Sequence, residues 1–161
     1  MKKTIVFLFS LFALFGQAQT YNYSATTGDV SLSSAGTSFT IQQPATNGKN
    51  VKLSSALVYC SVACDITQAQ NGTAATATAG TATAILPGGL FTPATATVWT
   101  ASNVGSGTAV GGTIHQTSQQ YIPIDLSKIS MGNTGKNTNY TITISSITGT
   151  ANITLFWTEA P

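Results

Sequence analysis

The sequence predicts an all-β protein: a single-domain antiparallel β-sandwich with jelly-roll or Greek-key connections and about eight to ten short strands. Three observations support this fold class. Apolar and polar residues alternate with a period of two along most of the chain, which is the pattern of half-buried strands. Gly, Pro and Asn recur between the alternating segments, where turns are needed. Threonine supplies 27 of the residues after position 18, and β-branched side chains favour strands over helices.

The first 18 residues have the pattern of a secretory signal peptide. Lys2 and Lys3 precede an apolar run over residues 5–15, and the small residues Gly16 and Ala18 flank Gln17 as a cleavage site requires. We therefore expect a signal peptide over 1–18, cleavage near Ala18 and one β-sandwich domain over 19–161. The product is predicted to be secreted, either extracellular or periplasmic. No later apolar run approaches the roughly 20 residues that a spanning helix needs, so no helical membrane anchor is expected.

Strands in the first half of the chain follow from short alternating segments. Val30 and Leu32 alternate with serines, and Phe39 and Ile41 alternate with polar residues until Pro44. A longer strand follows the turn signal Asn47-Gly48. Strict alternation places four of its side chains on one face and Val58 on the other; the four are Val51, Leu53, Leu57 and Tyr59. A further strand over 65–70 ends at a second turn signal, Asn71-Gly72.

The second half continues the same pattern. The Ala/Thr stretch over 73–85 is predicted to be a strand with small side chains, and residues 95–101 form another around Trp99. Pro123 interrupts the extended segment 114–126 and indicates an edge strand or a bulge, because proline cannot donate to a ladder. A C-terminal hairpin is the clearest local prediction. Its inward residues are expected to be Tyr140, Ile142 and Ile144 on one strand and Ile153, Leu155 and Trp157 on the other.

The charge of the chain is very low. The whole sequence has six lysines, no arginine, four acidic residues and one histidine, and removing Lys2 and Lys3 with the signal peptide leaves four of each sign. Nucleic-acid binding depends on clusters of basic side chains, so we expect no nucleic-acid partner. Neutrality also removes the repulsion that keeps molecules apart, which favours self-association.

Cys60 and Cys64 are the two cysteines, and an exported protein with an even count predicts a disulfide between them. Four extended steps would place their Cα atoms roughly 13 Å apart. A disulfide needs a Cα separation of about 4.4–6.8 Å. The chain is therefore expected to turn sharply between these residues. A redox pair or a zinc site is the weaker alternative, given the three-residue spacing and a single histidine.

The sequence offers few groups for catalysis. His115 is expected to be an ordinary exposed residue, although a serine, His115 and Asp125 would suffice in composition for a Ser-His-Asp hydrolase. No nucleophile-elbow pattern surrounds any serine. The four acids, Asp29, Asp65, Asp125 and Glu159, lie on separate segments and are interpreted as turn or strand-end residues. We therefore expect no enzyme, no catalytic residue, no cofactor and no metal site.

Aromatic side chains leave two interpretations open. Trp99, Tyr121, Tyr21 and Tyr23 could form a surface that stacks on sugar rings, or they could be core residues like Trp157 and Tyr140.

These observations favour an exported, non-enzymatic β-sandwich with a structural or adhesive role at the cell surface, whose partners are other copies of itself or surface glycans. The uncharged C-terminal strand over 152–158 is the predicted edge for pairing between copies, so lysine at Thr154 is expected to weaken the assembly. The alternatives are a carbohydrate-binding module that uses exposed aromatics and a small outer-membrane β-barrel, which about eight alternating strands would also fit.

Overall fold

The structure is a computed structural model that describes residues 20–43, 49–70, 78–79, 82–84, 94–101, 107–117, 119–129, 131 and 139–160. All regular elements in these ranges are β-strands. Nothing in the described part of the chain forms a helix long and apolar enough to cross a membrane. The predicted signal peptide and the turns at Asn47-Gly48 and Asn71-Gly72 lie outside the described residues, as does most of the 73–85 stretch.

Thirteen strands occur within the described residues. In chain order they are β1 (Tyr21–Thr26), β2 (Val30–Ser31), β3 (Thr37–Gln42), β4 (Asn50–Cys60), β5 (Cys64–Gln70), β6 (Thr78–Ala79), β7 (Ala82–Ala84), β8 (Thr97–Ala101), β9 (Thr108–Ala109), β10 (Ile114–Gln116), β11 (Tyr121–Asp125), β12 (Asn139–Ser145) and β13 (Thr150–Ala160).

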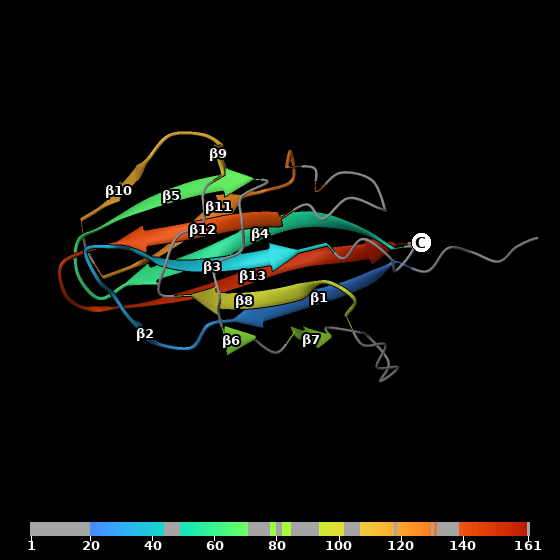
Figure 1. Cartoon of the computed structure of the whole chain (residues 1–161), viewed down its shortest axis with the longest axis horizontal. Helices are drawn as coiled ribbons and strands as arrows, with labels where there is room; N and C mark the ends of the chain where they lie inside the picture. The colour runs from blue at the N-terminus through green and yellow to red at the C-terminus, as the bar shows by residue number, and fades with distance from the viewer. Residues whose placement is uncertain are drawn as a thin grey trace, which may run out of the picture.

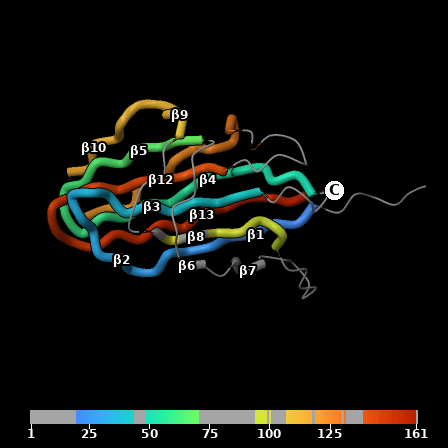
Figure 2. Tube along the Cα trace, in the orientation of Figure 1, coloured from blue at the N-terminus to red at the C-terminus, as the bar shows by residue number. Residues whose placement is uncertain are grey.

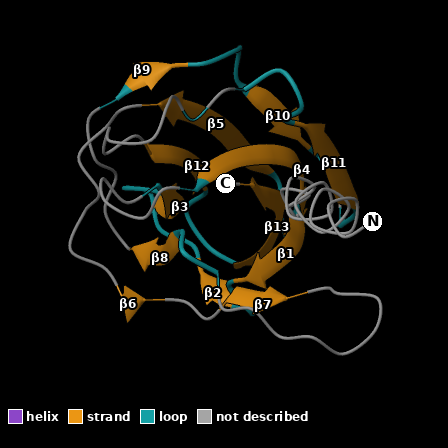
Figure 3. Cartoon of the chain, turned by 90° about the vertical axis from the view of Figure 1, so that its right-hand side faces the viewer, coloured by secondary structure: helices purple, strands orange, loops and turns teal. Residues whose placement is uncertain are grey.

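The strands form two separate antiparallel sheets that pack face to face (Figure 1). Sheet A has the order β11-β4-β13-β1-β7, with β2 also paired to β13. Sheet B has the order β10-β5-β12-β3-β8-β6, with β9 also paired to β5. The view along the strands shows the two layers from their ends (Figure 3). The predicted β-sandwich is confirmed.

Eight of the strands have the connections of a jelly roll. In chain order these strands are β1, β3, β4, β5, β10, β11, β12 and β13, and consecutive members lie in different sheets except for β5 and β10. Their spatial order is β1-β13-β4-β11 in sheet A and β3-β12-β5-β10 in sheet B. This double Greek key brings the first and last strands side by side. The four other strands between β5 and β10 extend both sheets. The segments 27–29, 61–63, 119–120 and 146–149 lie at one end of the sandwich, which we call the loop end, at the left of Figure 2.

Large apolar side chains from both sheets fill the space between them. Tyr23 of β1 stacks on Trp157 of β13 with ring centroids 5.7 Å apart. The predicted C-terminal hairpin is wrong, because β12 pairs with β3 and β5 in sheet B whereas β13 pairs with β4 and β1 in sheet A. The turn over 146–149 carries the chain from one sheet to the other. The alternation predicted for the two strands is confirmed, since their inward residues are all buried; they are Tyr140, Ile142, Ile144, Ile153, Leu155 and Trp157. Burial of such side chains, each contributing about 1.5–3 kcal/mol, holds the sheets together.

A β-bulge in β4 reverses the alternation that the sequence predicts. Opposite β13, Phe156 pairs with Ser55 and Trp157 pairs with Leu53, which leaves Ser54 as an extra residue. Its carbonyl instead accepts a hydrogen bond from the amide of Leu126 at 3.1 Å.

Beyond the bulge, the side chains of β4 change faces. Ala56, Val58 and Cys60 point into the core, while Leu57 and Tyr59 are only partly buried. The prediction that Leu57 and Tyr59 share a face with Leu53 is therefore wrong, because one inserted residue moves every later side chain to the other face.

The position of β13 corrects the predicted assembly edge. β13 pairs with β4 on one side and with β1 and β2 on the other, so the strand predicted to be an edge lies inside sheet A. The double Greek key causes this, because it inserts the last strand between the first and the fourth. Thr154 cannot take part in edge pairing with a second copy. The edge position predicted from Pro123 is confirmed, because β11 pairs only with β4 among the described strands.

The predicted disulfide lies at the corner where the chain leaves sheet A for sheet B. Cys60 ends β4, Cys64 begins β5, and the disulfide joins them across a Cα separation of 6.5 Å. The next turn of the loop end packs on this corner. Gly149 adopts a φ of +102°, and a Cβ atom there would lie 2.6 Å from Cγ2 of Val62. The close approach of the two turns therefore requires glycine at position 149.

Candidate functional site

The outer face of sheet A carries apolar side chains where a soluble sandwich usually has polar ones. Strand pairing places Tyr121 beside Tyr59 and Pro123 beside Leu57. All four point away from the core, since their neighbours Ile124, Ala56 and Val58 are the buried ones. We call Leu57, Tyr59, Tyr121 and Pro123 the tyrosine platform.

The two tyrosines of the platform contact each other. Their ring centroids are 5.1 Å apart and their planes are inclined by 37°, so the rings form a shallow V. The Tyr121 side chain is 57% exposed, whereas Tyr59 is partly covered. Tyr121 is one of only two large hydrophobic residues that the described structure leaves exposed. Burying such a ring against a partner would release water from a large apolar surface.

Polar groups border the platform along β13. Asn152 lies beside Tyr59 and Thr154 lies beside Leu57 in the strand register. The Asn152 carboxamide is held on both sides: its Oδ1 accepts a hydrogen bond from Thr26 Oγ1 at 2.9 Å, and its Nδ2 donates to Asp29 Oδ1 at 3.4 Å. The outer face of sheet A therefore combines apolar side chains with amide and hydroxyl groups of fixed orientation.

Asp125 lies at the end of the same edge strand. Its Oδ1 accepts a hydrogen bond from the Ser127 amide at 2.9 Å. This bond lowers the pKa of the exposed Asp125 carboxyl, because it stabilises the charged form. It is the one charged side chain in the three register rows that run from Tyr121 to Asp125 across β4 and β13.

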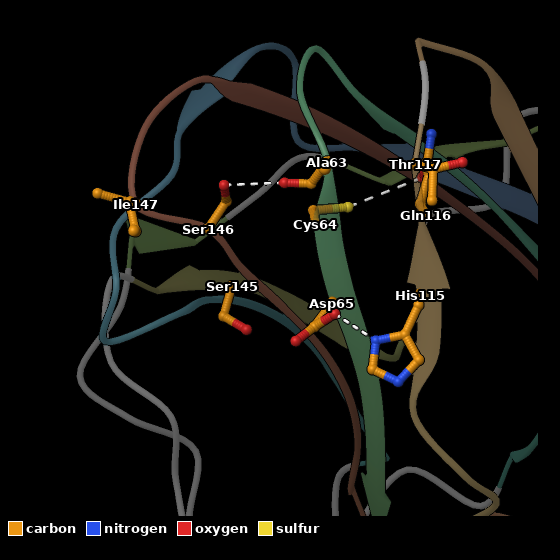
Figure 4. A pocket seen from close by; sticks show the side chains of 9 residues that line it. All are labelled: Ala63, Cys64, Asp65, His115, Gln116, Thr117, Ser145, Ser146 and Ile147. Atoms are coloured by element: carbon orange, nitrogen blue, oxygen red, sulfur yellow. Dashed lines mark hydrogen bonds and ion pairs between the residues drawn. The ribbon is translucent and has the colours of Figure 1, made fainter.

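A second site is a shallow hollow of about 310 Å³ at the loop end, where β5, β10 and the end of β12 meet (Figure 4). His115 Nδ1 lies 2.6 Å from Asp65 Oδ1, and both side chains are largely exposed, at 73% and 53%. Ser145 of β12 lies on the other side of Asp65, because Asp65 pairs with both Ser145 and His115.

The order of these groups matters for their chemistry. Figure 4 shows the Asp65 carboxylate between Ser145 and the His115 ring. A serine hydrolase needs the imidazole in the middle, so that it can take the proton from the hydroxyl while the carboxylate orients it. Here the carboxylate is central, between the serine hydroxyl and the imidazole (Figure 4). The Asp125 considered from the sequence lies in the other sheet. The arrangement can bind a polar group but does not reproduce the triad.

Glu159 lies at the end of β13, as interpreted from the sequence, but its burial was not foreseen. It is fully buried on the inner face of the strand. Its carboxylate accepts hydrogen bonds from the Thr95 amide at 2.9 Å, the Ala96 amide at 2.9 Å and Trp157 Nε1 at 3.2 Å, and also from the Thr95 hydroxyl. These bonds join sheet A to the segment that enters β8 of sheet B. Alternation along β13 points residue 159 inward, which places this strand-end acid in the core.

The four aromatic residues singled out from the sequence do not gather at one surface. Tyr23 is buried on Trp157, so it is a core residue, and burial together with the Glu159 charge raises its pKa. Tyr21 is partly buried at the end of the sandwich opposite Tyr121, with Lys49 Nζ 5.2 Å from its ring centroid. Trp99 belongs to β8, but its side chain lies outside the described residues. Of the three whose side chains the structure describes, Tyr121 alone is exposed, and its partner Tyr59 was not among the four.

The other acidic residues predicted from the sequence lie at the surface. Asp29 and Asp125 are exposed in turn or strand-end positions, as predicted. No three His, Cys, Asp or Glu side chains come together as metal ligands in the described ranges. No protein-family model, no curated protein and no solved structure matches this chain. The arguments about function therefore rest on the geometry alone.

The sequence analysis missed Leu57 and Tyr59 because it assumed uninterrupted alternation. The available signal is the pair Ser54-Ser55 in the middle of an eleven-residue strand, where small polar residues interrupt an apolar pattern. A bulge there is one way to resolve the interruption.

Proposed function

We propose that this protein is exported and has a structural or adhesive role at the cell surface, without catalysis, and that the tyrosine platform is its contact surface. The observation that carries the proposal is the bulge at Ser54. It directs Leu57 and Tyr59 outward beside Tyr121, although an unbroken strand would bury them. Two large apolar side chains therefore lie outside the core, and contact with a partner molecule would explain why they are there.

The strand edges support a face over an edge as the contact surface. The strands that end the two sheet orders within the described structure are β11, β7, β10 and β6, and none exceeds five residues. β11 also contains Pro123, which removes a backbone donor. Short edges and edge prolines are features that prevent strand addition by a second chain.

The test uses protein that begins at Gln19, labelled with a fluorophore and added to the cells that produce it. We expect Tyr59→Ser/Tyr121→Ser protein to be retained at least tenfold less than the unmodified protein, since two aromatic contacts are lost. Ile147→Ser is the matched control, because Ile147 is 85% exposed and lies at the loop end outside the platform. Equal retention of the double variant and the unmodified protein would refute the proposal.

A further inference from the structure

Building on the proposed function, we propose that the tyrosine platform binds a neutral glycan, with one hexopyranose ring stacked on Tyr121 and Tyr59 and hydroxyl groups of this and neighbouring sugar units bonded to Asn152 and Asp125. Three properties of the platform and its border suit a neutral glycan. They are exposed aromatic side chains, oriented polar groups beside them and a small area of low charge.

The aromatic faces suit the less polar side of a sugar ring. A pyranose has one face rich in C–H groups, and these pack on the electron-rich face of an aromatic side chain. Tyr121 is 57% exposed at the sheet edge, and Tyr59 lies 5.1 Å from it at an inclination of 37°. The more exposed Tyr121 is therefore the principal contact for the sugar ring, and the partly covered Tyr59 adjoins it.

The polar groups lie on both sides of the stacked ring, where hydroxyl groups of a glycan of several sugar units would reach them. Tyr121, Tyr59 and Asn152 occupy one register row that spans two strand spacings, roughly 10 Å. Thr26 and Asp29 hold the Asn152 carboxamide, and each amide nitrogen carries two hydrogens, so a second donor from Nδ2 remains for a ligand. An amide that is already oriented loses little conformational entropy on binding.

Asp125 supplies an acceptor at the other side of the platform. Its carboxyl has a lowered pKa and keeps one oxygen on the Ser127 amide. It lies two residues from Pro123 on the edge strand. A carboxylate accepts hydrogen bonds from sugar hydroxyls and disfavours an anionic ligand, which selects neutral over acidic glycans.

A second copy of the chain fits this surface less well. The platform is two strands wide and two rows long, on the order of 150 Å². A stable protein interface covers roughly 800 Å² on each partner. In a two-fold dimer the same patch faces itself, so Asp125 would be brought towards its own copy.

The experiment is calorimetric titration of protein beginning at Gln19 with three neutral hexamers: cellohexaose, maltohexaose and mannohexaose. Hexagalacturonate serves as the anionic comparison. We expect at least one neutral hexamer to bind, and Tyr121→Ala to weaken that binding at least tenfold. Tyr121→Phe keeps the stacking face and is expected to retain most of the affinity. Asn152→Ala is expected to weaken binding about fivefold, and Ile147→Ala to leave it unchanged. Thermal unfolding of each variant checks that it is folded.

Three outcomes overturn the inference. The first is that no neutral hexamer binds at concentrations up to about 10 mM, which would detect even millimolar dissociation constants. The second is preferential binding of hexagalacturonate. The third is equal affinity of Tyr121→Ala and the unmodified protein.

The cell-retention assay separates this inference from the proposed function. If no hexamer binds but the tyrosine double variant still loses retention, the glycan is wrong and the contact surface stands. Sedimentation that shows a platform-dependent dimer would also overturn the glycan, while keeping the contact surface and identifying a second copy as its occupant. If retention also ignores the tyrosines, both proposals fail.

Discussion

Two regions of the sandwich depart from the rule that apolar residues lie inside and charged residues outside. At one end of β13 the Glu159 carboxylate is fully buried, and on the outer face of sheet A the tyrosine platform is open to solvent. The buried acid is surrounded by donors from Thr95, Ala96 and Trp157. The platform has no comparable cover within the described structure.

This difference in hydrogen bonding distinguishes a residue that stabilises the fold from residues that are available to a partner. A buried charge with a full set of hydrogen bonds is accounted for by the fold, because those bonds replace its hydration. An exposed aromatic pair gains nothing from the fold beyond its own contact and calls for a partner. Substitutions in the two regions should therefore separate stability from attachment.

The largest expected effect comes from comparing two leucines on the same strand. Leu53 and Leu57 are four residues apart, but the bulge places Leu53 in the core and Leu57 on the platform. Leu53→Ala is expected to lower the free energy of unfolding by about 2–5 kcal/mol, since it leaves a cavity. Leu57→Ala is expected to cost less than about 1 kcal/mol. Urea denaturation of both variants measures this, and similar losses would mean that the alternation is not reversed.

Glu159→Gln tests the buried side of the comparison. The substitution keeps the shape but turns one acceptor into a donor facing the Thr95 and Ala96 amides. We expect a loss of about 2–3 kcal/mol in the free energy of unfolding, with cell retention unchanged at temperatures where the variant is folded. Asp125→Asn, at an exposed carboxylate, is the matched control and should lower the denaturation midpoint much less, since the Asn carbonyl oxygen can still accept from the Ser127 amide. A Glu159→Gln variant as stable as the control would remove Glu159 from the structural account.

Removing the disulfide tests whether the platform depends on the corner beside it. Cys60→Ala/Cys64→Ala opens a very short loop, so the entropic model gives a loss of about 2 kcal/mol. β4 remains paired to β13 and β11 along its length, and Tyr59 and Tyr121 should stay in register. Chemical denaturation should show the loss of stability while cell retention stays at the level of the parent protein. Loss of retention would show that the corner positions Tyr59.

The contrast also explains which features the sequence could predict. Alternation on β12 and β13 identified the inward residues correctly, from Tyr140 to Trp157, because neither strand has an inserted residue over those positions. The disulfide followed from the predicted export signal and the cysteine count, and the edge position of β11 followed from Pro123. These are local properties, and each is determined within a few residues.

The features that the sequence analysis missed depend on pairing between distant segments. The bulge at Ser54 becomes evident only when β4 is aligned with β13, about 100 residues later. The central place of β13 depends on the Greek-key order, and the Asp65–His115 pair depends on β10 joining β5. Glu159 resembles a solvated terminal residue until the segment before β8 brings its donors. Period-two patterns carry no information about which strands become neighbours.

The smallest expected effect is a change in the stability of the protein at high pH, and it comes from buried tyrosines. Burial raises the pKa of Tyr140, whose hydroxyl donates to Gln68 Oε1 at 2.7 Å, and burial also raises that of Tyr23. In the unfolded chain a tyrosine ionises near pH 10. Above that pH the unfolded state loses protons that the folded state keeps, so stability falls as the pH rises and is unaffected below it. Each such tyrosine contributes at most about 1.4 kcal/mol per pH unit.

Tyr140→Phe should therefore reduce the loss of stability between pH 9 and pH 11 in urea denaturation. At pH 7 this variant is expected to be less stable than the parent protein, because it lacks the hydrogen bond to Gln68. If Tyr140→Phe loses stability as steeply as the parent protein over this pH range, burial of Tyr140 does not govern the alkaline limit of the fold.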